Sequence, residues 1–307
     1  MQVSIKYAGF CLKGEVRLKN EDNLWYPRGC LPMEHGDLEV FDGSILASSD
    51  GLPGSGRSSG NFESISGAVP AGAGRDIADF KATSGAVPAE PDGGPGKAEA
   101  FAVFDGMGGA AAGEAASYLA AAEFGRWAGR SSGLRRGEEN AICRAMNQAV
   151  LTYAKAHRAP GMGSTVVSLC FDEAGAYGFN LGDSRCLRFS EGGLCALSTD
   201  HALVSPVTRR ARLTQCLGIP ETEFVLEPAV FSVEYHIGDI FLICSDGLTS
   251  MVGPVRISGV LSAEATLVEK LEALREMVFR RGAEDNVTII LFEICEAQTK
   301  TGEGTHE

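Results

Sequence analysis

The chain has 307 residues with 27 Lys or Arg against 40 Asp or Glu, a net charge of −13, and 44% apolar residues. The length allows one large domain or two ordinary ones, and the apolar share suffices for a sizeable core. The acidity argues against a surface that binds nucleic acid or anionic lipid. No apolar run approaches about 18 residues, which argues against a membrane span. Met1–Phe10 also lacks the apolar segment of a signal peptide, so we expect a cytoplasmic protein. We further expect a monomer with no nucleic-acid or membrane partner.

Nine cysteines are scattered along the chain, and none is part of a CxxC pair. Cys170, Cys244 and Cys295 stand in apolar, strand-like runs. These features are typical of reduced cysteines that pack as small hydrophobic side chains. A disulfide scaffold is therefore not expected.

Short apolar or alternating runs predict strands, and apolar residues at 3.6-residue spacing predict helices. Gly-containing turns between strands, such as Gly192-Gly193, favour antiparallel hairpins. The order favours an α+β fold with sheets covered by helices. The predicted strands are Val3–Tyr7, Ala100–Phe104, Ser164–Phe171, Ala176–Asn180, Arg185–Phe189, Val230–Tyr235, Ile240–Cys244 and Val287–Ile294, and the predicted helices are Ala110–Trp127, Glu138–His157 and Ala263–Arg280.

One segment differs in composition from the rest. Between residues 42 and 98, 35 of 57 residues are Gly, Pro, Ser or Ala, and SGAVPA occurs twice. This composition buries little apolar area, so we expect a flexible insertion in a single domain that spans residues 1–295. Residues 296–307 are predicted to be a loose polar tail.

Acidic residues follow or precede several of the predicted strands. Carboxylates at strand ends are held rigidly, and several of them in one place repel one another unless hard cations neutralise them. Oxygen ligands of this kind suit Mg²⁺ or Mn²⁺, and no Cys/His spacing offers a zinc site. Any one acid here could instead be an ordinary turn or cap residue. The clusters are Asn20–Asn23, Asp105 in Asp105–Gly109, Gly182–Arg185, Asp246-Gly247 and Glu284–Asn286.

Several short motifs follow one another in a fixed order along the chain. They are GEVRLKNEDN (Gly14–Asn23), FAVFDGMGGAAAGEAAS (Phe101–Ser117), GSTVV (Gly163–Val167), LGDSR (Leu181–Arg185), DH (Asp200-His201), LTQCLG (Leu213–Gly218), GDIFLICSDGL (Gly238–Leu248) and EDNVT (Glu284–Thr288). This ordered series resembles the metal-dependent protein Ser/Thr phosphatases of the PPM, or PP2C, family, bacterial branch. The resemblance spans about residues 1–295 apart from the insertion. It implies a four-layer αββα sandwich, with two antiparallel sheets flanked by helices.

The resemblance also implies roles for individual residues. It implies two metal ions, possibly three, with Asp105 as their bridging ligand and the carbonyl of Gly106 beside it. Asp183 corresponds to a ligand of a third, weaker ion. An acid of the Asn20–Asp22 cluster serves the second ion, and we favour Asp22 over Glu21 without excluding Glu21. The full implied metal set is Asp22, Asp105, Gly106, Asp183, Asp246 and Asp285.

The expected chemistry is hydrolysis of phosphoserine or phosphothreonine in proteins. Two cations about 3.5–4 Å apart activate a bridging water for in-line attack on phosphorus. Arg17 corresponds to the arginine that grips the substrate phosphate, for which a guanidinium is suited by its two parallel hydrogen bonds. The phosphoprotein products of a Ser/Thr kinase are the expected partners. Glu114 is read as support for its helix.

The sequence departs from the family pattern in two places. Met107 stands in the DG-x-GG loop where many eukaryotic members have His, so no proton donor is expected there. Only 11 residues, Ala202–Arg212, separate the DH and LTQCLG motifs. This short flap predicts an open site, and its arginines either meet an acidic phosphopeptide or are simply solvated.

Three other functions are considered. Gly-x-Ser-x-Gly occurs at Gly56–Gly60 and Gly129–Gly133, but neither follows a strand that could form a nucleophile elbow. A dinucleotide-binding loop at Phe101–Gly113 lacks the G-x-G-x-x-G spacing. A pseudophosphatase that binds phosphoproteins without turnover remains the alternative, although Asp105, Asp246 and Asp285 favour hydrolysis.

Overall fold

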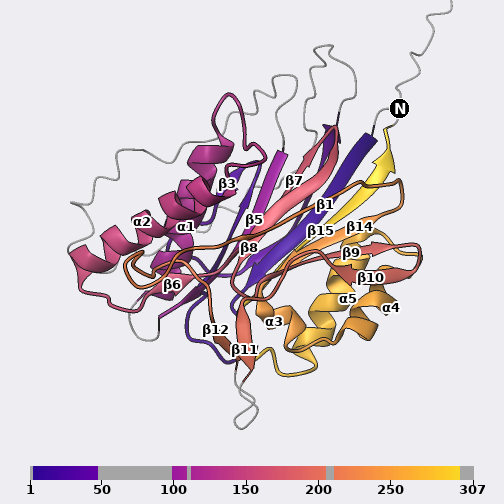
Figure 1. Cartoon of the computed structure of the whole chain (residues 1–307). Coiled ribbons are helices and arrows are strands. Elements are labelled where there is room, and N and C mark those ends of the chain that lie inside the picture. Colours follow the sequence, from indigo (N-terminus) through magenta and orange to yellow (C-terminus); the bar gives the residue numbers. More distant parts are fainter. Residues whose placement is uncertain (1–2, 48–98, 109–111, 205–210, 298–307) are drawn as a thin grey trace, which may run out of the picture.

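The computed structural model describes residues 3–47, 99–108, 112–204 and 211–297. Two antiparallel sheets pack face to face, and each carries helices on its outer face (Figure 1). The prediction of a four-layer αββα sandwich is thereby confirmed. None of the described helices is both long and apolar enough to cross a membrane.

The first sheet has six strands in the order β10-β9-β14-β15-β1-β4. Its central strand β14 is apolar throughout, because one face meets the other sheet and the other face meets helices. The strands are β1 (Val3–Leu12), β4 (Leu38–Ala47), β9 (Arg185–Ser190), β10 (Gly193–Ala196), β14 (Ile240–Cys244) and β15 (Val287–Glu296).

The second sheet follows the order β13-β8-β7-β5-β2-β3, with β6 paired to β5. A separate hairpin is formed by β11 (Ala202–Val204) and β12 (Ala211–Leu213). The strands of the second sheet are β2 (Asp22–Tyr26), β3 (Gly29–Cys30), β5 (Glu99–Met107), β6 (Gly163–Ser164), β7 (Val166–Asp172), β8 (Gly175–Leu181) and β13 (Ala229–Val233).

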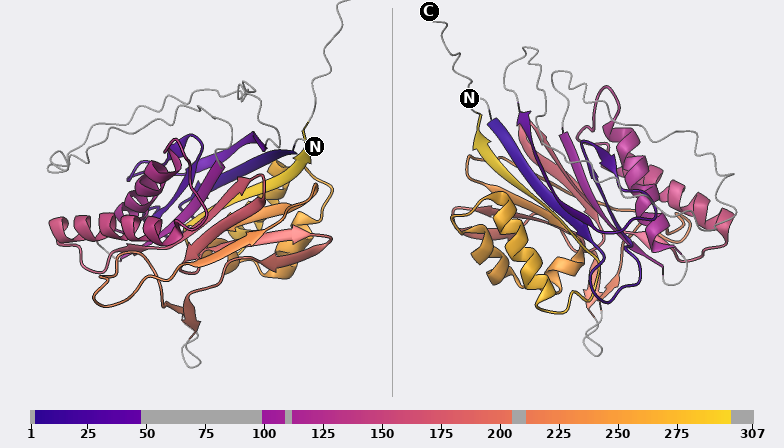
Figure 2. Two further views of the ribbon diagram at one scale, coloured as in Figure 1. Left: turned by 45° about the horizontal axis from the view of Figure 1, so that its top comes forward. Right: turned by 180° about the vertical axis from the view of Figure 1, so that it is seen from behind.

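Helices α1 (Gly113–Ala128) and α2 (Glu139–His157) cover the second sheet, and α3 (Asp246–Thr249), α4 (Pro254–Leu261) and α5 (Leu267–Phe279) cover the first (Figure 2). Each helical layer has its own apolar core against its sheet. A third core lies between the sheets, where Phe101 and Phe292 meet edge to face with ring centroids 4.7 Å apart. The two sheets are therefore fixed against each other, which fixes the relative positions of their strand ends.

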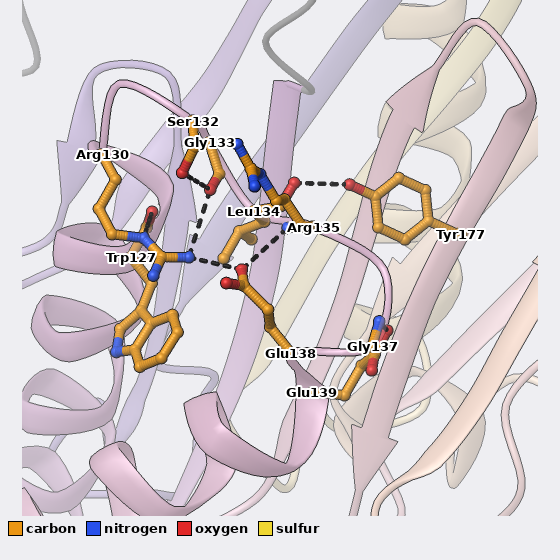
Figure 3. Close-up of polar contacts among 10 residues, drawn as sticks. All are labelled: Trp127, Arg130, Ser132, Gly133, Leu134, Arg135, Gly137, Glu138, Glu139 and Tyr177. Atoms are coloured by element: carbon orange, nitrogen blue, oxygen red, sulfur yellow. Dashed lines mark hydrogen bonds and ion pairs between the residues drawn. The ribbon is translucent and has the colours of Figure 1, made fainter.

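The loop between α1 and α2 is closed by its own polar contacts (Figure 3). Arg130 lies over the ring of Trp127 and donates to Glu138 at 2.5 Å. The hydroxyl of Tyr177 on β8 donates to the carbonyl of Leu134 at 3.0 Å. The second Gly-x-Ser-x-Gly motif, Gly129–Gly133, belongs to this loop and follows α1, so the absence of a nucleophile elbow there is confirmed.

Several elements fall outside the ranges predicted from sequence, namely strands β2, β3, β4, β10, β11 and β12 and helices α3 and α4. β4 runs to Ala47, so residues 42–47 at the predicted start of the insertion are strand. Residues 48–98 and 298–307 lie outside the described residues, as do Arg209 and Arg210 of the flap. The single-domain organisation and the flexibility of the insertion stay predictions.

Candidate metal and phosphate site

The functional residues predicted from sequence stand at strand ends that meet along one border of the sandwich. Asp22 opens β2 and is paired with Asp105 near the end of β5. Asp183 follows β8, Asp246 follows β14, and Asp285 precedes β15. The acids therefore come from both sheets, which explains how residues far apart in the chain reach one place.

A cavity of about 720 Å³ lies at this border. Asp105, Gly106, Asp183, Asp246 and Asp285 all line it, together with Arg17. Asp22 does not line the cavity but lies behind it, only 1% exposed, whereas Glu21 is part of the wall. The structure thus brings the whole predicted set together, with Asp22 in a second layer.

The buried carboxylates hold their protons more tightly than ordinary aspartates. Burial raises the pKa of Asp22 to about 7, against the opposing effect of the hydroxyl groups of Thr288 and Ser245. Burial, followed by the charges of Asp22 and Asp246, raises the pKa of Asp105 well above its usual range. Burial and the Asp246 charge raise the pKa of Asp183 to about 6. Carboxylates that raise one another's pKa in this way are stabilised by a bound cation.

The clearest indication of a cation site is a buried carboxylate oxygen of Asp22. Its Oδ2 accepts hydrogen bonds from Ser245 Oγ and Thr288 Oγ1, both at 2.7 Å. Its Oδ1 is buried and has no hydrogen-bond partner, the one such side-chain atom among the described residues. An orphaned anionic oxygen of this kind is costly unless a cation or a cation-bound water faces it.

The donor set fits a hard divalent cation, because it consists of carboxylate and carbonyl oxygens. The carboxyl groups of Asp105 and Asp246 lie within hydrogen-bonding reach of each other. In the part of the chain that is described, no three acidic, His or Cys side chains are grouped closely enough to hold an ion unaided. Mn²⁺ or Mg²⁺ would therefore complete its coordination with water, as Mg²⁺ commonly does.

Gly106 can reach the cavity only because it has no side chain. Its N–H donates to the carbonyl of Glu21 at 3.1 Å. A Cβ at this position would collide with the carbonyl oxygens of Glu21 and Gly113. The end of β5 is thus packed directly against the residue that precedes β2 and against the start of α1.

Sequence reasoning missed a layer of hydrogen-bonding residues behind the carboxylates. Thr165 Oγ1 accepts the N–H of Asp105 at 3.1 Å and lies 2.7 Å from Ser184 Oγ. Asn286 Oδ1 accepts the N–H of Glu21 at 2.8 Å. Ser184 and Asn286 stand inside two of the acidic clusters and Thr165 inside the GSTVV motif, but Ser, Thr and Asn are common in any loop, so their position alone did not indicate this role.

Arg17 lies at the cavity wall, with its guanidinium bound to Asp285 Oδ2 at 2.7 Å. Lys19 is paired with Glu114 at the start of α1, and both line the cavity. The interpretation of Glu114 as helix support alone was therefore incomplete, because the turn of α1 also faces the site. Met107 lines the wall as well.

The motif Asp200-His201 has the structural role expected for it. Asp200 binds Arg185 through two nitrogens, at 2.9 Å to Nε and 2.5 Å to Nη2. The ring Nδ1 of His201 accepts the N–H of Gly182 at 3.2 Å. These contacts brace the loop that carries Asp183.

A two-sheet sandwich with an acidic cavity at its strand ends is the architecture of a metal-dependent phosphatase. A sequence model of the family described as protein phosphatase 2C matches residues 93–287, and the chain belongs to that family.

Relatives and solved structures agree with this assignment. The serine/threonine phosphatase Stp of Listeria monocytogenes is 29% identical over 208 residues, which cover 62% of this chain and 82% of that protein. The crystal structure of the Mycobacterium tuberculosis serine/threonine phosphatase PstP superimposes with a TM-score of 0.64 at 22% identity, covering 95% of this chain and all of that one. The catalytic domain of PstP in complex with two manganese ions gives a TM-score of 0.63 at 22% identity, covering 96% of this chain and 100% of that one. The structural matches establish the fold.

Proposed function

We propose that the protein hydrolyses phosphoserine and phosphothreonine in proteins and that it uses Mn²⁺ or Mg²⁺. The observation that carries the proposal is the convergence of four aspartates from both sheets on one cavity that also contains Arg17. The names of the relatives as serine/threonine phosphatases support the substrate class, and the manganese complex of PstP supports the cofactor. The proposed substrates are products of protein Ser/Thr kinases, met by a monomer in the cytoplasm.

The residues proposed to hold the ions are Asp22, Asp105, Asp183, Asp246, Asp285 and the carbonyl of Gly106. When bound, the ions would acidify a water molecule and offset the negative charge of the phosphoryl group. The chain itself prepares the site by burying carboxylates and by bracing their strands with Thr165, Ser245 and Thr288. Such preorganisation means that little rearrangement is needed at the moment of reaction.

Arg17 is the proposed phosphate ligand. Its side chain is 47% exposed at the cavity wall, so an entering phosphoryl group can reach it. Two parallel N–H donors fix the orientation of the phosphate and thereby the line of attack. No histidine is among the described residues that line the cavity, and the proposed proton donor to the leaving oxygen is water or a protonated carboxyl group.

The test is phosphate release from a phosphothreonine peptide with Mn²⁺, with a chelator, and by the variant Asp105→Asn. Metal-dependent release that falls about 10²–10³-fold or more in the variant supports the proposal. Asp42→Asn is the matched control, because Asp42 is exposed on β4. A wild-type protein that binds Mn²⁺ in a calorimeter but releases no phosphate would be a pseudophosphatase instead.

A further inference from the structure

The segment that carries Arg17 is a short loop closed at its base, which we call the Arg17 loop (residues 13–19). The side-chain amide of Asn286 donates to the carbonyls of both loop ends, to Lys13 at 2.8 Å and to Lys19 at 2.9 Å. Gly14 has φ +79°, and a Cβ there would lie 2.7 Å from the carbonyl oxygen of Ala283. The loop is therefore held in one shape, although residues 15–19 are all exposed.

Near the C-terminal end of this loop a leucine is exposed to water. Leu18 is 96% exposed, yet it lines the same cavity as the carboxylates. Both of its neighbours are held by ion pairs, Arg17 by Asp285 and Lys19 by Glu114. Leu18 therefore lies on a rigid loop, directly beside Arg17, the proposed phosphate ligand.

The other residues of the cavity determine which substrate side chains could contact Leu18. Six acidic side chains line it against two cationic ones, but four of the six are proposed metal ligands, so the remaining wall has no excess of positive charge to attract an acidic side chain on the incoming peptide. Leu213 of β12 and Met107 add apolar surface to the same wall. A peptide whose phosphorylated residue reaches Arg17 also passes close to Leu18, because both residues line the same cavity and are adjacent in the chain.

We infer that Leu18 is a specificity-determining residue that packs against the side chain next to the phosphorylated residue, so that the enzyme prefers phosphopeptides with an apolar residue there. This inference rests on the proposed function. Removing a leucine side chain from water is favourable, and the fixed loop means that little entropy is lost when the contact forms. The substrate class is thus a phosphopeptide with an apolar flank and no acidic cluster.

The experiment compares three phosphothreonine peptides that differ only in the flanking residue, as Leu, Ser or Glu. For the wild type we expect kcat/KM to be about 5–10-fold higher with Leu than with Ser, through KM, and lowest with Glu. The variant Leu18→Ser should reduce the Leu-to-Ser ratio to below about 2-fold. Its loss on the Leu peptide should exceed its loss on p-nitrophenyl phosphate, which has no flanking residue. Val255→Ser is the matched control, since Val255 is 84% exposed on α4.

An unchanged Leu-to-Ser ratio in Leu18→Ser, or an equal loss on the peptide and on p-nitrophenyl phosphate, overturns the inference. Binding of the same three sequences as non-hydrolysable phosphonate peptides, followed by fluorescence anisotropy, measures the preference without turnover. An inactive wild type that still binds the Leu peptide most tightly, with the preference lost in Leu18→Ser, refutes the proposed function and supports the inference. Equal binding of the three peptides by the wild type overturns the inference whether or not the protein is active.

Discussion

Asp22 and Asp105 are directly opposite each other on the paired strands β2 and β5. Residues opposed in this way project to the same face with their Cβ atoms about 4.5–5.5 Å apart. Two buried carboxylates are therefore held side by side by the backbone itself, where the charge of Asp22 helps to raise the pKa of Asp105. The arrangement is costly in the metal-free protein and favourable once a cation is bound.

The first prediction separates Asp22 from Glu21 as the acid that serves the metal site. Because Asp22 Oδ1 is buried without a partner, Asp22→Asn should lower Mn²⁺ affinity about 10–100-fold. Glu21 is in the wall and less buried, so Glu21→Gln should lower the affinity by a smaller factor. Isothermal titration calorimetry measures both. The reverse order of the two effects would assign the role to Glu21.

The second prediction concerns the pH dependence of stability without metal. The folded-state pKa is about 7 for Asp22 and about 6 for Asp183, above the value of about 3.9 expected in the unfolded chain. A carboxyl group with a raised folded-state pKa stabilises the protein fully below pH of about 4. This contribution is lost as the pH rises through 6 and 7. The free energy of unfolding contributed by these groups should therefore fall between pH 5 and pH 8, and Mn²⁺ should raise Tm more at pH 8.

Thermal unfolding at both pH values, with Mn²⁺ and with chelator, checks this. Asp183→Asn is the informative variant, because its amide does not titrate in this range. Its metal-free form should lose less stability between pH 5 and pH 8 than the wild type. An equal or larger loss would show that Asp183 is not one of the groups responsible.

The third prediction tests the hydroxyl groups behind Asp22. Thr288 is fully buried, and its hydroxyl donates to Asp22 Oδ2. Thr288→Val keeps the shape but removes a hydrogen bond to a charged acceptor, which should lower the free energy of unfolding by about 1.5–3 kcal/mol. Urea denaturation measures the change. Thr222→Val, at an exposed position, should change it by less than about 0.5 kcal/mol.

The central strands and the site acids were predictable because their signals are local. Apolar runs such as Ile240–Cys244 are followed closely by an acid, and the end of a buried strand is where a side chain can project rigidly into a cavity. The convergence of these ends could be anticipated from the ordered motifs. The sequence could not show which site acids line the cavity and that Asp22 is buried behind them, because this depends on how the two sheets are packed.

The missed strand β4 shows why some local signals mislead. Asp42-Gly43 is typical of a turn, yet Gly43 lies inside the strand, opposite Tyr7 on β1. The Tyr7 ring covers Gly43 so closely that a Cβ there would lie 2.5 Å from its Cζ atom. The glycine is thus required by a contact between strands 36 positions apart in the sequence, which no window of the sequence contains.

The fourth prediction concerns Arg17. Arg17→Lys keeps the charge but cannot form two parallel hydrogen bonds to a phosphate. Loss of one charge-assisted hydrogen bond corresponds to a fall in kcat/KM of about 10–100-fold, which we expect mainly as a higher KM. Arg126→Lys on the exposed face of α1 is the control. Steady-state kinetics in which both variants match the wild type would exclude Arg17 as the phosphate ligand.

The last prediction concerns Asn286, whose side chain makes three hydrogen bonds, two to the ends of the Arg17 loop and one to the N–H of Glu21. Asn286→Ala should lower the free energy of unfolding by about 2–4 kcal/mol, because it leaves three part-buried backbone groups without these partners. Asn140→Ala, exposed on α2, is the matched control.

Asn286→Ala should also raise KM, since the Arg17 loop is then no longer held at a fixed distance from Asp285. A double-mutant cycle with Arg17→Ala tests whether Asn286 affects KM through the position of Arg17. If Asn286 acts by positioning Arg17, its substitution raises KM several-fold in the wild-type background and changes KM little once Arg17 is absent. Additive effects on KM would instead mean that Asn286 supports the fold without positioning the phosphate ligand.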